Sequence, residues 1–172
     1  MKLEENSSPP VFREVQRFHP VFYFIVLISS FSIWVVAFIQ IILKIPVGNN
    51  PASDTFLLIF LFLFGVLFPY IFLKIKLTTE LRTDGIYVKM FPFHFKWQYF
   101  PFENIERAEL IKYSPLKDYG GWGIRYGKGG KAYNARGNMA VMLYLKNGKK
   151  LLIGTQRGEE FIDILKSYLK NK

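Results

Sequence analysis

The stretch VFYFIVLISSFSIWVVAFIQIIL, residues 21–43, contains 23 consecutive residues without a charge. At about 1.5 Å per residue, a helix of this length is roughly 34 Å long, which exceeds a hydrocarbon core of about 30 Å. A second uncharged stretch, TFLLIFLFLFGVLFPYIFL, covers residues 55–73. Uncharged apolar runs of roughly 18 or more residues are typical of membrane-spanning helices. The sequence therefore predicts two transmembrane helices, at residues 21–43 and 55–73.

The segment between the two runs, KIPVGNNPASD, has the Pro, Gly and Asn content of a tight turn. The two helices are therefore expected to form a hairpin within residues 20–75, with Asp54 as the N-cap of the second helix. Gly65 and Pro69 are expected to bend that second helix. Neither run contains an Asp, Glu, Lys, Arg or His, so the ionisable groups expected of a pump or carrier are missing.

The charges that flank the hairpin predict its orientation. Arg13 and Arg17 precede the first run and Lys74 and Lys76 follow the second, whereas the connecting turn has one cation and one anion. The positive-inside bias therefore predicts a two-span protein of the cell membrane with both termini in the cytoplasm. Residues 1–19 are expected to be a short cytoplasmic segment. Its part after Ser8 is either a helix lying along the headgroups or an extended lead-in.

Composition divides the chain of 172 residues into two different parts. Residues 1–73 hold four cations and four anions, whereas residues 74–172 hold 19 cations and nine anions. Cysteine is absent, which excludes disulfides, thiolate catalysis and cysteine-ligated metals, and only two histidines are present. No nucleophile–base pair and no phosphate-loop glycine spacing is found. The chain is predicted to be non-enzymatic, without a cofactor or metal site.

From residue 76 onward the pattern changes to short β-prone runs. Asp84-Gly85 and Asn147-Gly148 each separate two such runs, as in β-hairpins. Between residues 158 and 171 apolar residues recur at helical spacing, with glutamates in the first turn and lysines near the end. Residues 76–172 are therefore expected to form an α+β domain. Its antiparallel barrel or sandwich of about seven strands would be closed by a C-terminal amphipathic helix.

Several motifs carry a family resemblance. The hairpin is followed by TDGIYVKM (residues 83–90), FPFENIERAEL (100–110) and a tail beginning GWGIR (121–125). In this order they resemble the prokaryotic membrane-anchored pleckstrin-homology-like (PH-like) domain proteins of uncharacterised function. The resemblance implies a PH-like fold for residues 76–170 and supplies no catalytic residue. Lipid-binding members of the wider superfamily use cations in the first strand–strand loop. Here that loop, residues 83–85, has none, so phosphoinositide recognition is not implied.

Residues 112–136 are the first candidate for function, because cations and aromatic residues alternate there against a single anion, Asp118. Lysine and arginine attract phosphate groups, and aromatic side chains favour the membrane interface. The candidate residues for binding lipid or a partner are Lys112, Lys117, Trp122, Arg125, Lys128, Lys131 and Arg136. The alternative is a solvated hairpin whose aromatic residues pack against the edge of the sheet. Single-stranded nucleic acid would use the same residue types, but the membrane tether argues against it.

Residues 91–97, FPFHFKW, are the second candidate, as a loop that dips into the interface or packs against the helical hairpin. His94 alone is a weak signal for a metal or for acid–base chemistry. We expect a non-catalytic binding or scaffolding module at the inner leaflet. Its expected contacts are the bilayer, anionic headgroups, other membrane proteins or a second copy of the chain. The alternative is an accessory subunit of a larger membrane enzyme or transporter.

Overall fold

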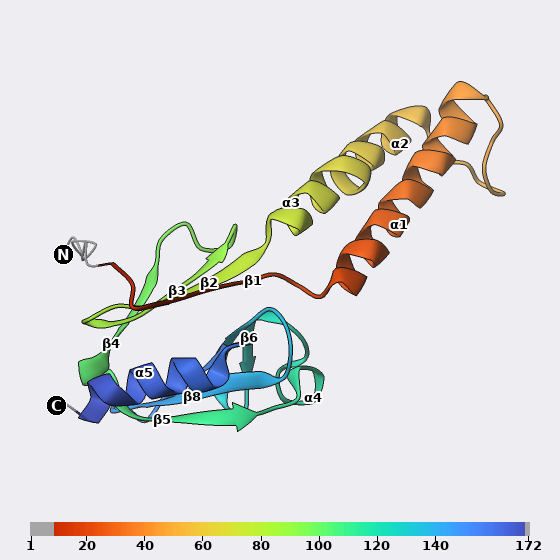
Figure 1. The fold of residues 1–172 in the computed structure, drawn as a ribbon. Helices are drawn as coiled ribbons and strands as arrows, with labels where there is room; N and C mark the ends of the chain where they lie inside the picture. The colour runs from red at the N-terminus through yellow and green to blue at the C-terminus, as the bar shows by residue number, and fades with distance from the viewer. Residues whose placement is uncertain (1–8, 171–172) are drawn as a thin grey trace. The chain divides into compact units, whose positions relative to one another are not determined.

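The computed structural model describes residues 9–170, which form two compact units (Figure 1). Residues 19–75 make the helical unit. Residues 9–18 and 76–170 together make the β unit. The helical unit is thus inserted into the sequence of the β unit.

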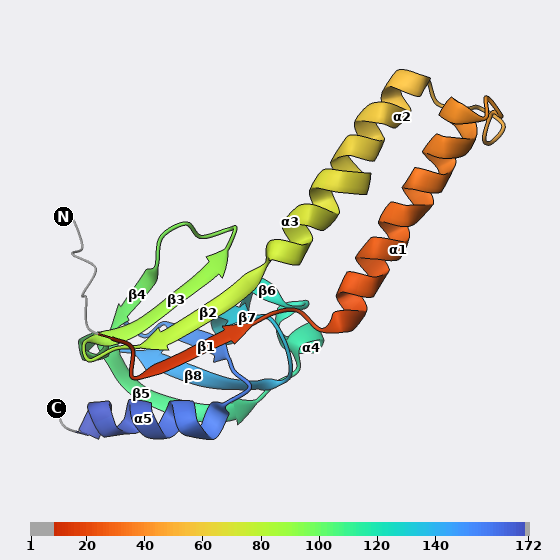
Figure 2. The ribbon, with the colours of Figure 1, turned by 45° about the horizontal axis from the view of Figure 1, so that its top comes forward.

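The helical unit contains the two predicted helices, which run side by side in both ribbon views (Figures 1 and 2). Its elements are α1 (Pro20–Ala37), the π-helical η1 (Phe38–Ile42), α2 (Asp54–Phe60), the π-helical η2 (Leu61–Leu67) and α3 (Phe68–Lys74). Together they form two continuous helices, Pro20–Ile42 and Asp54–Lys74, that are long and apolar enough to cross a membrane. The expected N-cap was wrong by one residue, since Ser53 accepts the backbone N–H of Phe56.

Side chains of the first helix bind backbone carbonyls that the second helix leaves free. The N–H of Phe68 donates to the carbonyl of Leu63 in the π-helical pattern, and Pro69 has no N–H to donate. The carbonyl of Phe64 accepts the hydroxyl of Ser30 at 3.2 Å, and that of Gly65 accepts the Nε1–H of Trp34 at 3.1 Å. An apolar environment makes such bonds necessary, because no water is present to replace them.

The first sheet of the β unit contains the strand that precedes the helical unit. Its strands, in spatial order, are β1 (Phe12–Gln16), β2 (Lys76–Leu81), β3 (Gly85–Phe91) and β4 (Gln98–Pro101), and all neighbours are antiparallel. Burial alternates along β1, with Glu14 and Gln16 buried and Val15 exposed. Period-two burial is the pattern of a strand. The interfacial helix that was one expectation for this segment is therefore wrong, and the extended alternative is correct.

The second sheet has the spatial order β5-β8-β9-β7-β6, in which only the β7–β9 pair is parallel. The 3₁₀ helix η3 (Phe102–Asn104) leads into it, and its elements are β5 (Ile105–Lys112), α4 (Pro115–Tyr119), β6 (Gly123–Gly127), β7 (Gly130–Asn134), β8 (Met139–Leu145) and β9 (Lys150–Gly154). Within residues 9–170 the fold is α+β, with nine strands in two sheets that do not close into a barrel. The closed barrel, one of the two expected forms, is therefore wrong, whereas the expected α+β class is confirmed.

The predicted C-terminal helix is confirmed as α5 (Gly158–Lys170). Phe161 stacks on Phe12 of β1 with ring centroids 5.1 Å apart, and Tyr168 stacks on Phe102 at 5.2 Å. Phe161 and Leu165 are fully buried. The helix therefore packs against both the first strand of the domain and the segment that joins the two sheets.

Buried polar groups fasten β1 to the end of β9. Glu14 accepts the hydroxyl of Thr155 at 2.6 Å and the backbone N–H of Gln156 at 2.8 Å. Gln16 donates to the carbonyl of Gly154 at 2.7 Å. Glu14 is only 7% exposed, so these bonds are made away from water. They join the two sheets at a point where no backbone ladder runs.

Replacing Glu14 by alanine is expected to destabilise the β unit, because the Thr155 hydroxyl and the Gln156 N–H lose their acceptor. Leaving the buried Thr155 hydroxyl unpaired costs about 1–3 kcal/mol, and the Gln156 N–H, which belongs to an exposed residue, adds less. The measurement is the free energy of unfolding of the full chain in detergent, followed by near-UV circular dichroism. Glu159→Ala, at an exposed position of α5, is the control and should stay near wild type. Equal stability of the two variants would contradict a structural role for Glu14.

Candidate functional site

The predicted binding residues are distributed along the chain from the end of β5, through α4 and the β6–β7 hairpin, to the loop after β7. They are distributed as Lys112 at the end of β5, Lys117 in α4, Trp122 before β6, Arg125 in β6, Lys128 in the β6–β7 turn, Lys131 in β7 and Arg136 after it. All are exposed except Trp122 and Lys131, which are half-buried. Among the ion pairs between described residues, none involves these six cations. Their charge is therefore available to a ligand.

One face of the β6–β7 hairpin combines a cation with two tyrosines. Tyr126 is directly opposite Lys131 in the antiparallel register, and Tyr133 is two residues further along β7 on the same face. The Lys131 Nζ lies 5.8 Å from the ring centre of Tyr126 and 4.8 Å from that of Tyr133. Partial burial alone would lower the pKa of Lys131, but the nearby hydroxyls of Tyr133 and Tyr126 raise it overall. Lys131 therefore stays charged at neutral pH.

Both faces of β7 reach the core, since Tyr133, on the same face as Lys131, and Ala132, on the opposite face, are fully buried. Ala132 packs with Tyr113, Tyr119 and Met142 in a buried cluster. Burial raises the pKa of Tyr113 to about 12. Of the aromatic residues interleaved with the cations, only Tyr126 is exposed, at 75%. For most of these aromatic residues, packing within the domain, the alternative reading of the sequence, is therefore correct.

The second candidate, residues 91–97, forms a loop after β3 that is ordered by a backbone hydrogen bond and a ring contact. The N–H of His94 donates to the carbonyl of Met90 at 2.7 Å, and the ring of Phe91 meets that of Phe95 edge-on at 6.2 Å. Phe93 and Phe95 remain 60% and 76% exposed. The loop thus presents two phenylalanines to the surroundings.

The structure brings these two candidate stretches together. The ring of His94 meets that of Tyr133 edge-on, with centroids 5.6 Å apart. Burial, and then the nearby charge of Lys131, lower the pKa of His94. His94 is therefore neutral at neutral pH and serves as a packing residue between loop 91–97 and β7. The sequence alone did not predict this contact, because the two residues lie in different sheets.

A further cation–aromatic cluster was not singled out from the sequence. The guanidinium of Arg107 lies 3.7 Å from the ring centre of Tyr144, and the Lys150 Nζ lies 5.4 Å from it. The Tyr144 hydroxyl donates to Glu109 at 3.0 Å, and Arg107 pairs with the same carboxylate. Alternating charged residues in β5 were the only sequence signal. Because Arg107 and Tyr144 already bind Glu109, this cluster is better suited to stabilising the sheet than to ligand binding.

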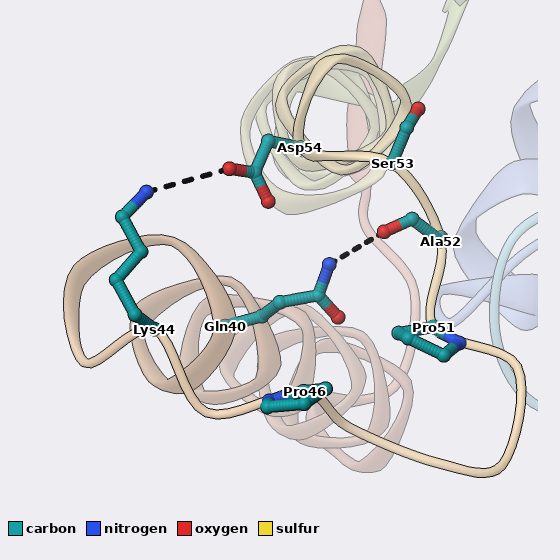
Figure 3. A pocket seen from close by; sticks show the side chains of 7 residues that line it. All are labelled: Gln40, Lys44, Pro46, Pro51, Ala52, Ser53 and Asp54. Atoms are coloured by element: carbon teal, nitrogen blue, oxygen red, sulfur yellow. Dashed lines mark hydrogen bonds and ion pairs between the residues drawn. The ribbon is translucent and has the colours of Figure 1, made fainter.

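A pocket of about 270 Å³ lies at the turn of the helical unit (Figure 3). Gln40 donates to the carbonyl of Ala52 across it, and Lys44 pairs with Asp54 at 3.4 Å. Because these polar groups bind one another, they stabilise the turn and are not left to bind a ligand. Over residues 9–170 no three His, Asp or Glu side chains are grouped to hold a metal ion.

Comparison with known proteins gave one finding. A family described as a family of unknown function (DUF6141) matches residues 3–170. Neither the curated proteins nor the solved structures gave a match. The matched residues thus include the whole helical unit and nearly all of the β unit.

Gly130→Ala is expected to destabilise the β7–β9 pair. Gly130 has φ +87°, and an added Cβ would collide with the backbone carbonyl of Lys150. We expect a loss of about 3 kcal/mol in the free energy of unfolding, because the parallel pair must separate. Gly148→Ala is the matched control, since its φ is +77° but no atom lies within 4 Å of the added Cβ. It should cost about 1 kcal/mol from backbone strain alone. Similar losses of unfolding free energy in the two variants would mean that the collision with Lys150 contributes little to the destabilisation.

Alkaline pH is expected to weaken the β unit through Tyr113. Its pKa in the folded chain is about 12, against an ordinary value of 10.0. The raised value favours the neutral phenol in the fold. Its contribution is therefore complete below pH 10 and is lost as the pH rises toward 12. Unfolding curves at pH 8, 10 and 11 should show a smaller loss for Tyr113→Phe than for wild type. The exposed Tyr126→Phe should follow wild type, and identical behaviour of all three would refute the assignment.

Proposed function

This chain belongs to a family of unknown function (DUF6141), and we propose that it is an integral membrane protein whose PH-like β unit binds anionic lipid headgroups without catalysis. The observation that carries this proposal is the set of six cations without an ion pair among the described residues between Lys112 and Arg136, in a chain that also has two helices fit to cross a bilayer.

The surface of the helical unit supports membrane insertion. Large apolar side chains are exposed around both helices, including Phe24, Phe31, Ile42 and Phe62 at 59–69%. Leaving such a side chain in water rather than in an apolar medium costs about 1.5–3 kcal/mol. Hydrocarbon is the surrounding that removes this cost along the whole length of both helices.

The β1–β2 pair supports a topology with both ends of the hairpin on the same side. Gln16, four residues before Pro20, pairs with Leu77, three residues after Lys74. Two strands of one sheet lie on the same side of a bilayer, so the chain crosses an even number of times between them. The cations at Arg13, Arg17 and Lys76 favour the cytoplasmic side.

The order of elements supports a PH-like β unit. In residues 76–170, eight strands in two sheets are followed by one C-terminal helix, the order that the resemblance in the sequence leads us to expect. The β6–β7 hairpin carries three of the candidate cations, Arg125, Lys128 and Lys131. In this proposal the β6–β7 hairpin, rather than the short Asp84-Gly85 turn, is the headgroup-binding element.

The chemistry of this surface suits an anionic leaflet. Each lysine or arginine close to such a surface contributes about 1 kcal/mol, or roughly fivefold in affinity. Tyr126 adds an exposed aromatic ring beside Lys131. Lys112, Lys117, Lys128 and Arg136 are exposed to solvent, and Arg125 is held by a hydrogen bond of 3.0 Å from its Nε–H to the carbonyl of Trp122.

The test is native mass spectrometry of the full chain in detergent with an equimolar mixture of phosphatidylglycerol and phosphatidylcholine. The full chain is used because β1 belongs to the β unit. Wild type should retain more of the anionic lipid, and a variant with Lys128, Lys131 and Arg136 replaced by alanine should lose this preference. A matched variant with Lys146, Lys149 and Lys166 replaced by alanine, all exposed, removes the same charge elsewhere. Equal loss in both variants would reduce the effect to net charge and contradict a defined surface.

A second candidate, an accessory subunit of a larger complex, is favoured by one feature of the helical unit. Phe56, Phe60, Phe64 and Phe68 follow each other at four-residue spacing, with successive ring centroids 5.9, 4.6 and 6.4 Å apart, and each ring is at least partly accessible. Such a row can pack against a helix of another protein as well as against lipid. A defined protein that co-purifies with the wild-type chain in the same spectra would favour this candidate.

A further inference from the structure

We infer that the loop of residues 91–97 is an interfacial insertion element, which places Phe93 and Phe95 among the headgroups of the bilayer that holds the chain's own helices. This inference deepens the proposed function and rests on its premise that the two helices span a membrane. It adds an apolar contact to the electrostatic contact proposed for the β6–β7 hairpin.

The exposure of the loop is the first argument. Phe95 and Phe93 are 76% and 60% exposed. The loop itself is packed on the domain, because the ring of Phe91 contacts that of Phe95 and the imidazole of His94 contacts Tyr133. The backbone bond from His94 to Met90 fixes its turn. The two phenylalanines are thus presented by a supported loop, and no described part of the β unit covers them.

The register of the first sheet is the second argument. Phe91, the last residue of β3, is opposite Lys76, and Met90 is opposite Leu77. Lys76 is two residues after Lys74, where α3 ends. Two residues span at most about 7 Å, and paired strand residues are about 5 Å apart. Chain connectivity therefore keeps Phe91 within about 12 Å of the end of the helix, whatever the angle between the units.

The loop also lies at the correct end of the sheet. β1 ends at Gln16, opposite Leu77, so the chain leaves for the helical unit and returns from it at the strand ends next to Phe91. The opposite end of β2 and β3 is the Asp84-Gly85 turn, which has no exposed large apolar residue. Only one end of the β2–β3 hairpin thus combines exposed aromatic rings with the connection to the helices.

The charge of the loop is consistent with a headgroup environment. Lys96 is exposed beside Phe95, and Lys89 lies near Trp97 with its Nζ 5.8 Å from the ring centre. Aromatic side chains with neighbouring lysines are favoured at the membrane–water interface, where the ring is buried and the ammonium group stays hydrated. A protein partner would also accept two phenylalanines, so the test must separate lipid from protein.

The test uses the chain's small number of tryptophans, Trp34, Trp97 and Trp122. All three are replaced by phenylalanine in the full-length chain, and one tryptophan is then introduced at a chosen position. Phe95→Trp reports the loop, and Phe62→Trp reports the second helix. Val11→Trp is the control, since Val11 is 46% exposed and its N–H bonds to Leu81 at the opposite end of β2. Each variant is reconstituted in phosphatidylcholine nanodiscs, with bromine placed at shallow or deep positions of the acyl chains.

The tryptophan of Phe95→Trp should show blue-shifted emission and stronger quenching by shallow than by deep bromine, while that of Val11→Trp stays unquenched. Quenching of the Phe62→Trp variant together with water-like emission from Phe95→Trp would overturn the insertion of the loop and leave the spanning helices intact. Loss of quenching in both the Phe62→Trp and the Phe95→Trp variant would refute the proposal that the chain is an integral membrane protein. Phe93→Ser in the Phe95→Trp background should shift the emission to the red, and an unchanged spectrum would contradict joint insertion. Blue-shifted emission that appears only after addition of a cell extract and is not quenched by bromine would indicate a protein partner and contradict insertion.

Discussion

The pairing of β1 with β2 is the constraint on which the rest of the structure depends. It joins two segments that are separated in the sequence by the entire helical unit. Through Phe12 and Glu14 the same strand reaches α5 and the end of β9, so one short segment contacts both sheets and the C-terminal helix. The ends of the helical hairpin are therefore held by a strand pair rather than by a single flexible linker. Phe91 and its loop lie at the same strand ends because the β2–β3 register places them there.

Local patterns in the sequence predicted the local elements well. The two apolar helices, the β-turns at Asp84-Gly85 and Asn147-Gly148, and the helix after Gly158 each follow from residues that are close in the sequence. β1 was not identified with certainty, because a five-residue strand with its partner some sixty residues away carries little local signal. The parallel β7–β9 pair was missed for the same reason, since residues 135–149 separate the two strands. Two separate sheets rather than a barrel result from such long-range pairings.

In the candidate site, too, properties of single residues could be predicted from the sequence, whereas contacts between distant residues could not. The alternation of cations and aromatic residues identified the exposed surface at Lys128 and Arg136, because charge is a property of each residue alone. The burial of an aromatic side chain, by contrast, depends on its neighbours in space: Tyr113 and Tyr133 are buried in the core, whereas Tyr126 is exposed. The contact of His94 with Tyr133 unites two stretches that the sequence could only treat separately.

The insertion of the helices between two paired strands also determines the order in which the fold can form. A ribosome delivers β1 first, and this strand has no partner until both helices have been made and β2 follows them. The hydrogen bond between Glu14 and Thr155 can form only after Thr155, 141 residues later, has been synthesised. The second sheet can assemble among residues 105–154 in the meantime, since its strands are close in sequence. The contacts of the earliest strand are thus completed only when the end of β9 and α5 have been made.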